Sequence, residues 1–274
     1  MNRIFLFSIV FILFFNSCEK EKELVYEDYQ SSTLIRQIGV TEDLTSINDM
    51  QVMTYYNTGY IFEHLQRFSY RKFIYNQKNQ LIKIEIALSF NPLSCAIVPG
   101  ASFTDGDDPR KAKIGRYLEF EYSNEGKLKR RNFYFINDDN PQLTNYEEYE
   151  YNNDYIVKIN VFNPQDQLTH YSTYSYDSNG NVSEVEFHYM QDGDAKLQTR
   201  VLYEYDDKNN PFKVFAVEGT PGVNTNKNNI TKQTTMYYYG EEEQSDTVEY
   251  TYEYNDLGYP VKANNVEYTY GEEQ

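Results

Sequence analysis

The chain has 274 residues, and its 42 Asp and Glu against 25 Lys and Arg give a formal net charge of −17. This acidity argues against nucleic acid as a partner and against attraction to anionic membranes, because both depend on cationic side chains. The aromatic content is 29 Tyr and 17 Phe with no Trp. Tyrosine suits the half-wet surface of a pleated sheet, so the composition indicates strands throughout.

The first 17 residues are typical of an export signal. Arg3 supplies a positive charge and precedes an apolar run from 4 to 15 that only Ser8 interrupts. A membrane-spanning helix needs roughly 20 residues, so this shorter run predicts a signal peptide. The run ends at Asn16-Ser17-Cys18, which resembles the lipobox of Bacteroidota lipoproteins. The resemblance implies cleavage before Cys18 and lipidation of its thiol; a plain signal peptide with an incidental cysteine is the alternative.

The remaining chain divides into a tether and a domain. Residues 18–32 begin with alternating Glu and Lys after Cys18, which predicts a lipid-anchored flexible tether. Cleavage removes Arg3, so the charge goes from −17 to −18, and 274 − 17 = 257 residues remain. That length suits one large β domain or two small ones, and we interpret 33–274 as a single β-repeat domain. Only Cys95 remains besides Cys18, so the mature chain has no intramolecular disulfide, and Cys95 is interpreted as a buried, inert thiol.

One pattern recurs: an aromatic residue, any residue, Tyr, a four-residue polar turn and renewed alternation. Its second tyrosines are Tyr75, Tyr122, Tyr151, Tyr176, Tyr205 and Tyr254. Asp or Asn opens such a turn by bonding its own backbone, and Gly or Asn closes it at positive φ. Each unit is therefore predicted to be a hairpin. The fold class follows: all-β, an antiparallel hairpin meander forming a large curled sheet or a soluble, partly open barrel. Residues 91–113 and 219–232 are interpreted as inserted loops.

Two hairpin registers are compatible with the sequence. A three-residue turn closed by glycine pairs Tyr122 with Leu128, Tyr176 with Val182 and Tyr254 with Pro260. A two-residue turn pairs Glu121 with Arg130, Glu204 with Lys213 and Glu253 with Lys262. Both give cross-strand contacts of about 0.2–1 kcal/mol. Basic residues are also predicted to interrupt the tyrosine face, which argues against a lipid-facing wall. These residues are Lys83, Arg130, Lys213 and Lys262.

Two stretches carry a resemblance to known families. The segment from Tyr174 to Asn181, YSYDSNGN, resembles the YD repeats of Rhs-type proteins. The segment from Tyr250 to Pro260, YTYEYNDLGYP, is similar to Bacteroidota lipoproteins of the DUF4595 kind. The resemblance covers roughly residues 70–270 and implies a many-stranded, porin-like β architecture in the cell envelope. It implies no catalytic residues.

Motifs for chemistry are missing from the sequence. It has no Gly-rich phosphate loop, no G-x-S-x-G, no H-E-x-x-H and no C-x-x-C. The three histidines, His64, His170 and His188, are interpreted as strand-face residues. Asp105-Gly106-Asp107-Asp108 offers oxygens to Ca²⁺ but lacks EF-hand spacing, so a solvated loop is the preferred interpretation. We predict no metal site, no cofactor and no catalytic residue.

The remaining candidates are tyrosines and the cysteine. Rows of tyrosine on a wide sheet suit stacking against sugar rings, or they hold the sheet together as cross-strand ladders. The candidate ligand-stacking residues are Tyr174, Tyr176, Tyr203, Tyr205, Tyr252 and Tyr254. Cys18 is the candidate lipidation site.

The sequence thus predicts a non-enzymatic, lipid-anchored binding or scaffold module at the outer membrane, on its periplasmic or cell-surface face. Its expected partners are the membrane, through the anchor, and a glycan or envelope protein. A glycan-binding accessory lipoprotein of a polysaccharide-uptake system is the alternative. A glycan hydrolase with a carboxylate pair from distant loops ranks third.

Overall fold

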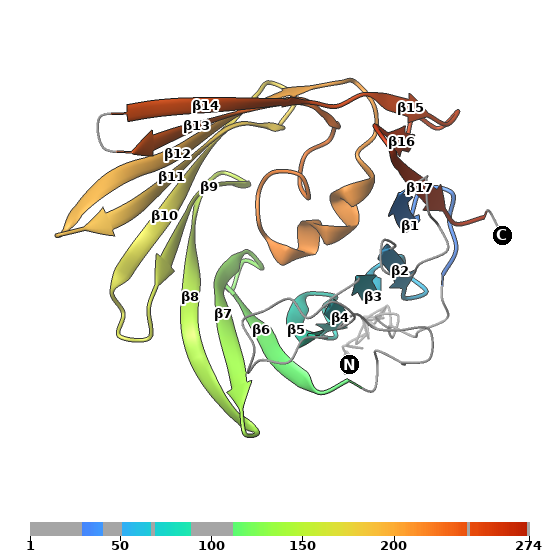
Figure 1. Ribbon diagram of the computed structural model, residues 1–274. Helices are drawn as coiled ribbons and strands as arrows, with labels where there is room; N and C mark the ends of the chain where they lie inside the picture. The colour runs from blue at the N-terminus through green and yellow to red at the C-terminus, as the bar shows by residue number, and fades with distance from the viewer. Residues whose placement is uncertain (1–28, 41–50, 67–68, 89–111, 240–241, 273–274) are drawn as a thin grey trace, which may run out of the picture.

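The computed structural model describes residues 29–40, 51–66, 69–88, 112–239 and 242–272, and its strands form one 17-stranded sheet (Figure 1). The first nine strands are β1 (Ile35–Val40), β2 (Gln51–Tyr55), β3 (Ile61–Gln66), β4 (Ser69–Tyr75), β5 (Leu81–Leu88), β6 (Ile114–Tyr122), β7 (Leu128–Asn137), β8 (Asn140–Asn152) and β9 (Tyr155–Phe162). The others are β10 (Leu168–Tyr176), β11 (Val182–Gln191), β12 (Asp194–Tyr205), β13 (Ile230–Tyr239), β14 (Glu242–Glu249), β15 (Tyr252–Tyr254), β16 (Pro260–Ala263) and β17 (Val266–Tyr270). One 3-10 helix, η3 (Pro211–Glu218), follows β12.

The sheet is an antiparallel meander that curls on itself. Each strand from β1 to β13 pairs with the next one along the chain, and β15, β16 and β17 lead back to β1. Between β14 and β15 the chain passes from one neighbouring strand to another. The N–H of Tyr250 donates to the carbonyl of Thr231 in β13, whereas the carbonyl of Thr251 accepts the N–H of Asn264, which follows β16. The sheet therefore does not close into a barrel. This confirms the all-β, curled architecture predicted from the repeat.

Several turns at one end of the sheet share a hydrogen-bond pattern, and we call this end the asparagine rim. At Asp177 the carboxylate Oδ1 accepts the N–H groups of Asn179 and Asn181, both at 2.9 Å, and Gly180 closes the turn at φ 85°. The turns opened by Asn76 and Asn255 repeat this bonding. The predicted turn chemistry is thus confirmed at these positions.

A β-bulge after each glycine turn reconciles the two predicted registers. Tyr122 pairs with Leu128 and Glu121 pairs with Arg130 in the same hairpin, because the ladder shifts by one residue between the two pairs. The hairpins of Tyr176 and Tyr254 shift in the same way. A one-residue shift moves the following side chains to the other face of the sheet.

The shift corrects the prediction that basic residues interrupt the tyrosine face. Lys83 lies opposite Glu119, Arg130 opposite Glu121, and Lys262 opposite Glu253, so these cations lie on the outer, glutamate-lined face. Arg130 and Glu148 also form an ion pair at 2.5 Å across β7 and β8. The tyrosine face turns inward, where Tyr55, Phe73 and Ile84 are fully buried.

The repeated tyrosine has a structural role that the pattern alone did not reveal. In five of the six copies its hydroxyl donates to the backbone carbonyl at or near the start of a strand in the neighbouring hairpin. Tyr252 and Tyr270, at other positions, do the same, whereas the sixth copy, Tyr254, donates to the carboxylate of Asp206. The bonds are Tyr75 to Ile61 (3.1 Å), Tyr122 to Leu81 (2.8 Å), Tyr151 to Leu128 (2.9 Å), Tyr176 to Ile156 (2.7 Å), Tyr205 to Val182, Tyr252 to Ile230 (2.8 Å) and Tyr270 to Pro260 (2.7 Å). Most of these bonds join two consecutive strands at the end opposite the connection between those strands, so they tie neighbouring hairpins together along the asparagine rim.

Removal of one such hydroxyl should cost stability. We expect Tyr122→Phe and Tyr151→Phe each to lower the free energy of unfolding by about 1 kcal/mol, because each leaves a carbonyl without its donor. Tyr171→Phe is the matched control, since the hydroxyl of Tyr171 bonds to none of the described residues. Urea denaturation of the three variants measures the difference. Equal stability of all three variants would mean that the hydroxyl bonds contribute nothing.

Residues 207–228, which we call the insert, leave the sheet and fill its interior (Figure 1). Asp206 N–H donates to Asn229 O at 3.1 Å, so the two ends of the insert meet as the ends of a turn do. The sequence had predicted a hairpin here, with Glu204 opposite Lys213. That prediction was wrong: Glu204 pairs with Lys232 of β13, and Lys213 lies in η3. Within the described residues, no helix has the length and apolar character needed to cross a membrane.

Candidate functional site

Buried amides attach the insert to the asparagine rim. Asn181 and Asn226 are 0% and 1% exposed. Asn181 Oδ1 accepts the backbone N–H of Lys227 at 2.8 Å, and Asn226 Oδ1 accepts that of Val182 at 2.8 Å. Asn226 also donates to the hydroxyl of Tyr205 at 2.8 Å. Because both amides are paired with backbone or hydroxyl groups, their burial carries little penalty.

A charged cluster holds the other side of the insert. Glu218, the last residue of η3, accepts from Arg71 at 2.5 Å through its carboxylate and from Arg131 at 2.9 Å through its carbonyl. Arg131 also pairs with Glu147, whose carboxylate accepts the hydroxyl of Tyr149 at 2.8 Å. These groups come from β4, β7 and β8, so the cluster ties η3 to three strands.

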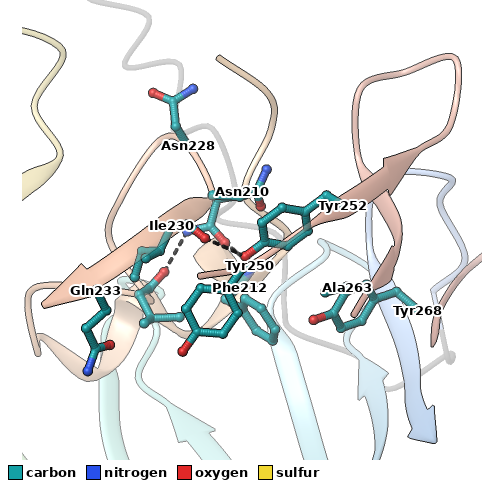
Figure 2. Close-up of a pocket in the computed structure, with 11 residues that line it drawn as sticks. Asn210, Phe212, Asn228, Ile230, Gln233, Tyr250, Tyr252, Ala263 and Tyr268 are labelled. Carbon is teal, nitrogen blue, oxygen red and sulfur yellow. Dashed lines mark hydrogen bonds between the residues drawn. The ribbon is translucent and has the colours of Figure 1, made fainter. Parts of the chain in front are cut away.

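Between the insert and the sheet lies a pocket of about 220 Å³, which we call the aromatic pocket (Figure 2). Phe212 and Val223 of the insert face residues of β13, β15, β16 and β17 and of the link before β15. Phe212 meets Tyr268 edge to face, with ring centroids 6.0 Å apart. The lining residues are Asn210, Phe212, Val223, Asn228, Asn229, Ile230, Gln233, Tyr250, Tyr252, Ala263 and Tyr268.

Some side chains of the pocket wall are held by hydrogen bonds, whereas two of its tyrosine hydroxyls have no hydrogen-bond partner among the described residues. Asn210 donates to Asn226 O at 2.9 Å and accepts from Phe212 N–H at 2.9 Å, and so caps η3. Tyr252 is fixed by its bond to Ile230. The hydroxyls of Tyr250 and Tyr268, in contrast, bond to none of the described residues. Burial raises the pKa of Tyr268, so its hydroxyl is a protonated donor at neutral pH.

The six tyrosines proposed to stack on a ligand all point to the inner face but are not one site. Tyr252 alone lines the aromatic pocket. Tyr254 donates to the carboxylate of Asp206 at the end of the insert. Burial raises the pKa of Tyr174 to about 12, and Tyr203 lies beside Tyr205 with ring centroids 6.4 Å apart. Tyr176 and Tyr205 donate to backbone carbonyls.

Other predicted positions fall elsewhere. His64, His170 and His188 lie in β3, β10 and β11, as expected for strand residues. Cys18, Cys95 and the Asp105–Asp108 loop lie outside the described residues, as does the predicted signal peptide. Across the described part of the chain, no three His, Cys, Asp or Glu side chains gather closely enough to hold a metal ion.

Sequence reasoning missed most of the pocket. Tyr250 and Tyr268 alternate with polar residues in the sequence, but nothing in that pattern indicates that they are neighbours. Phe212 was assigned to a hairpin arm, and Gln233 carries no local signal. The pocket depends on the insert folding back, which no spacing in the sequence indicates.

No protein-family model and no curated protein matches the sequence. Comparison of the structure with solved structures is informative about the fold. A porin-like protein from Bacteroides vulgatus aligns over 87% of this chain and 98% of its own, with a TM-score of 0.50 and 11% identity. The fold is similar to that porin-like protein. The porin-like architecture implied by the sequence resemblance is thereby confirmed at the level of the fold.

Two further matches have lower scores. A porin-like protein from Bacteroides uniformis aligns over 88% of this chain and 100% of its own, with a TM-score of 0.38 and 13% identity. The TcdB2-TccC3 structure aligns over 74% of this chain and 10% of its own, with a TM-score of 0.30 and 14% identity.

Proposed function

We propose that this protein is a non-enzymatic binding module, held at the cell envelope by a lipid anchor on Cys18, and that the aromatic pocket is its ligand site. The pocket lining carries this proposal. It joins four aromatic rings to amide side chains and contains no Asp, Glu, Lys, Arg, His or Cys. Of the side chains that acid–base and nucleophilic catalysis use, the lining contains only tyrosine, so it favours binding over chemistry.

The lining also favours one class of ligand, a neutral sugar ring. The faces of Phe212, Tyr250 and Tyr268 suit the apolar face of a pyranose, while the hydroxyls and the amide of Gln233 suit its hydroxyl groups. A volume of about 220 Å³ limits the ligand to one ring or the end of a chain. The glycan-binding interpretation is therefore the form of the proposal that this pocket supports best.

A glycan array probed with the full-length protein, followed by calorimetry on any neutral glycan bound, tests the ligand site. We expect Tyr268→Phe and Gln233→Ala to weaken binding about tenfold, as the loss of one hydrogen bond to the ligand would. Tyr171→Phe, on the outer face, should bind as the wild type does. The pocket is not the ligand site if both pocket variants bind as tightly as the control.

Fractionation of cells tests the anchor separately. Cys18→Ala should move the protein from the membrane fraction to the soluble fraction, because lipidation of the cysteine is the proposed attachment. Protein that stays with the outer membrane after this change would contradict the anchor, whatever the pocket binds.

A further inference from the structure

A second cavity, of about 510 Å³, lies far from the asparagine rim. Its walls come from β5, β6, β7 and β8, and Arg116, Phe135 and Asn145 lie toward the strand ends opposite that rim. The volume falls within the roughly 300–1,000 Å³ of small-molecule sites. The cavity shares no residue with the aromatic pocket.

The cavity is apolar at its inner end. Leu118 is part of the main core, 8% exposed, and Ile86 and Phe133 pack against that core. Phe215 of η3 belongs to the same core. An apolar chain placed along these side chains would leave water, which favours binding in proportion to the area buried.

The cavity is cationic at its outer end. Arg116 is exposed, and its guanidinium carbon lies 5.9 Å from the centre of the Phe135 ring. Arg71, Arg130, Arg131 and Arg200 each pair with a glutamate, whereas Arg116 forms no ion pair with any described residue. A free guanidinium in so acidic a chain is a donor for an external anion, and its planar fork matches a carboxylate.

We propose that this cavity binds a long-chain fatty acid, with the carboxylate on Arg116 and the acyl chain along Ile86, Leu118 and Phe133. An apolar interior with a single cation at the mouth matches a ligand with one anionic head and one apolar tail. The volume favours one acyl chain over the two chains of a phospholipid.

Photo-crosslinking tests the proposal on the full-length protein in phosphatidylcholine nanodiscs. A photoactivatable palmitate should label peptides within 114–145, and unlabelled palmitate should compete while hexadecanol, which lacks the charge, should not. Arg116→Gln should reduce labelling about tenfold, as expected for the loss of a charge-assisted contact. Lys113→Gln is the matched control, because Lys113 already pairs with Asp139 at 2.9 Å and does not line the cavity.

Three results would overturn the proposal. Equal competition by hexadecanol would show that no anionic head is recognised, and this comparison uses the wild-type protein alone. Stronger competition by phosphatidylglycerol than by palmitate would assign the cavity to a phospholipid. Labelling of Arg116→Gln at the level of Lys113→Gln, with circular dichroism unchanged, would show that Arg116 is not involved.

Discussion

Replacement of Arg131 by methionine is expected to lower the free energy of unfolding by about 3–5 kcal/mol. The Arg131 side chain is 9% exposed and its partner Glu147 is 12% exposed. Arg131 holds Glu147 at 2.6 Å and the carbonyl of Glu218 at 2.9 Å. Without the guanidinium, a buried carboxylate and the end of η3 both lose their partner. Denaturation in urea gives the free energy, and hydrogen exchange over 211–218 should show that η3 is exposed more often.

Two variants test the cause of this effect. Arg131→Met combined with Glu147→Gln should recover part of the loss, because no uncompensated charge then remains buried. Arg200→Met removes an arginine that pairs with Glu184 on the outer face and is 39% exposed. That pair should contribute only about 0–1 kcal/mol. If Arg131→Met costs no more than Arg200→Met, the cluster does not hold the insert.

The local parts of the fold could be predicted because their causes are local. Leu118, Phe120 and Tyr122 alternate with glutamates in the sequence, as expected for one face of a strand, and all three belong to or pack against the main core. The turn from Asp177 to Gly180 forms from bonds between residues at most four apart, which the sequence order brings together. Curling of the sheet followed from the number of repeated hairpins, and the sequence left barrel closure open.

Long-range contacts decided what could not be predicted. Asp206, like Asp177, opens a polar segment typical of a turn. The chain nevertheless enters the interior, because Asn226 and Lys227 bond to Val182 and Asn181, more than 40 residues earlier. The bulge that sets the register has a local cause by comparison, because it accompanies the turns closed by Gly126, Gly180 and Gly258. The boundaries of η3 did carry local signals, Asn210 before Pro211 and Gly219 after the helix at φ 75°.

The candidate site was predicted least well, for the same reason. Tyr252 was selected as part of a tyrosine row, whereas its partners in the pocket come from the insert and from the last strand. Most of the other selected tyrosines have hydroxyls committed to the backbone or to Asp206. The repeat therefore determines mainly how neighbouring hairpins are held together, and the proposed ligand site lies where the insert interrupts the repeat.

Acidification is expected to destabilise the protein through His64. Burial, and next the charge of Arg71, lower the pKa of His64 from 6.5 to about 3. The ring packs against Phe215 of the insert, with centroids 4.9 Å apart and planes inclined at 47°, and Nε2 lies 2.9 Å from Gln51 Oε1. Its Nδ1 is buried without a hydrogen-bond partner among the described residues, so a second proton there would have no acceptor.

The direction of this pH dependence follows from the pKa of His64 in the folded and the unfolded protein. The unfolded chain protonates His64 near pH 6.5, whereas the folded protein does so only near pH 3. The stability due to neutral His64 is therefore complete above pH 6.5 and is lost as the pH falls toward 3. The slope approaches about 1.4 kcal/mol per pH unit, so roughly 2–3 kcal/mol should be lost between pH 7 and pH 4.5.

His64→Gln isolates this contribution, because glutamine retains a donor for Gln51 and does not titrate. As the pH falls, the unfolding free energy of the wild type should decrease relative to that of His64→Gln. The carboxylates titrate alike in both proteins, so they do not contribute to this difference. His170→Gln is the matched control, since partial burial also lowers the pKa of His170 but its ring is not packed under the insert. Parallel stability curves for the wild type and His64→Gln from pH 7 to pH 4.5 would show that the ring is not held neutral. A divergence confined to His64→Gln would instead place the acid-sensitive contact of the fold beneath Phe215, where the insert meets the sheet.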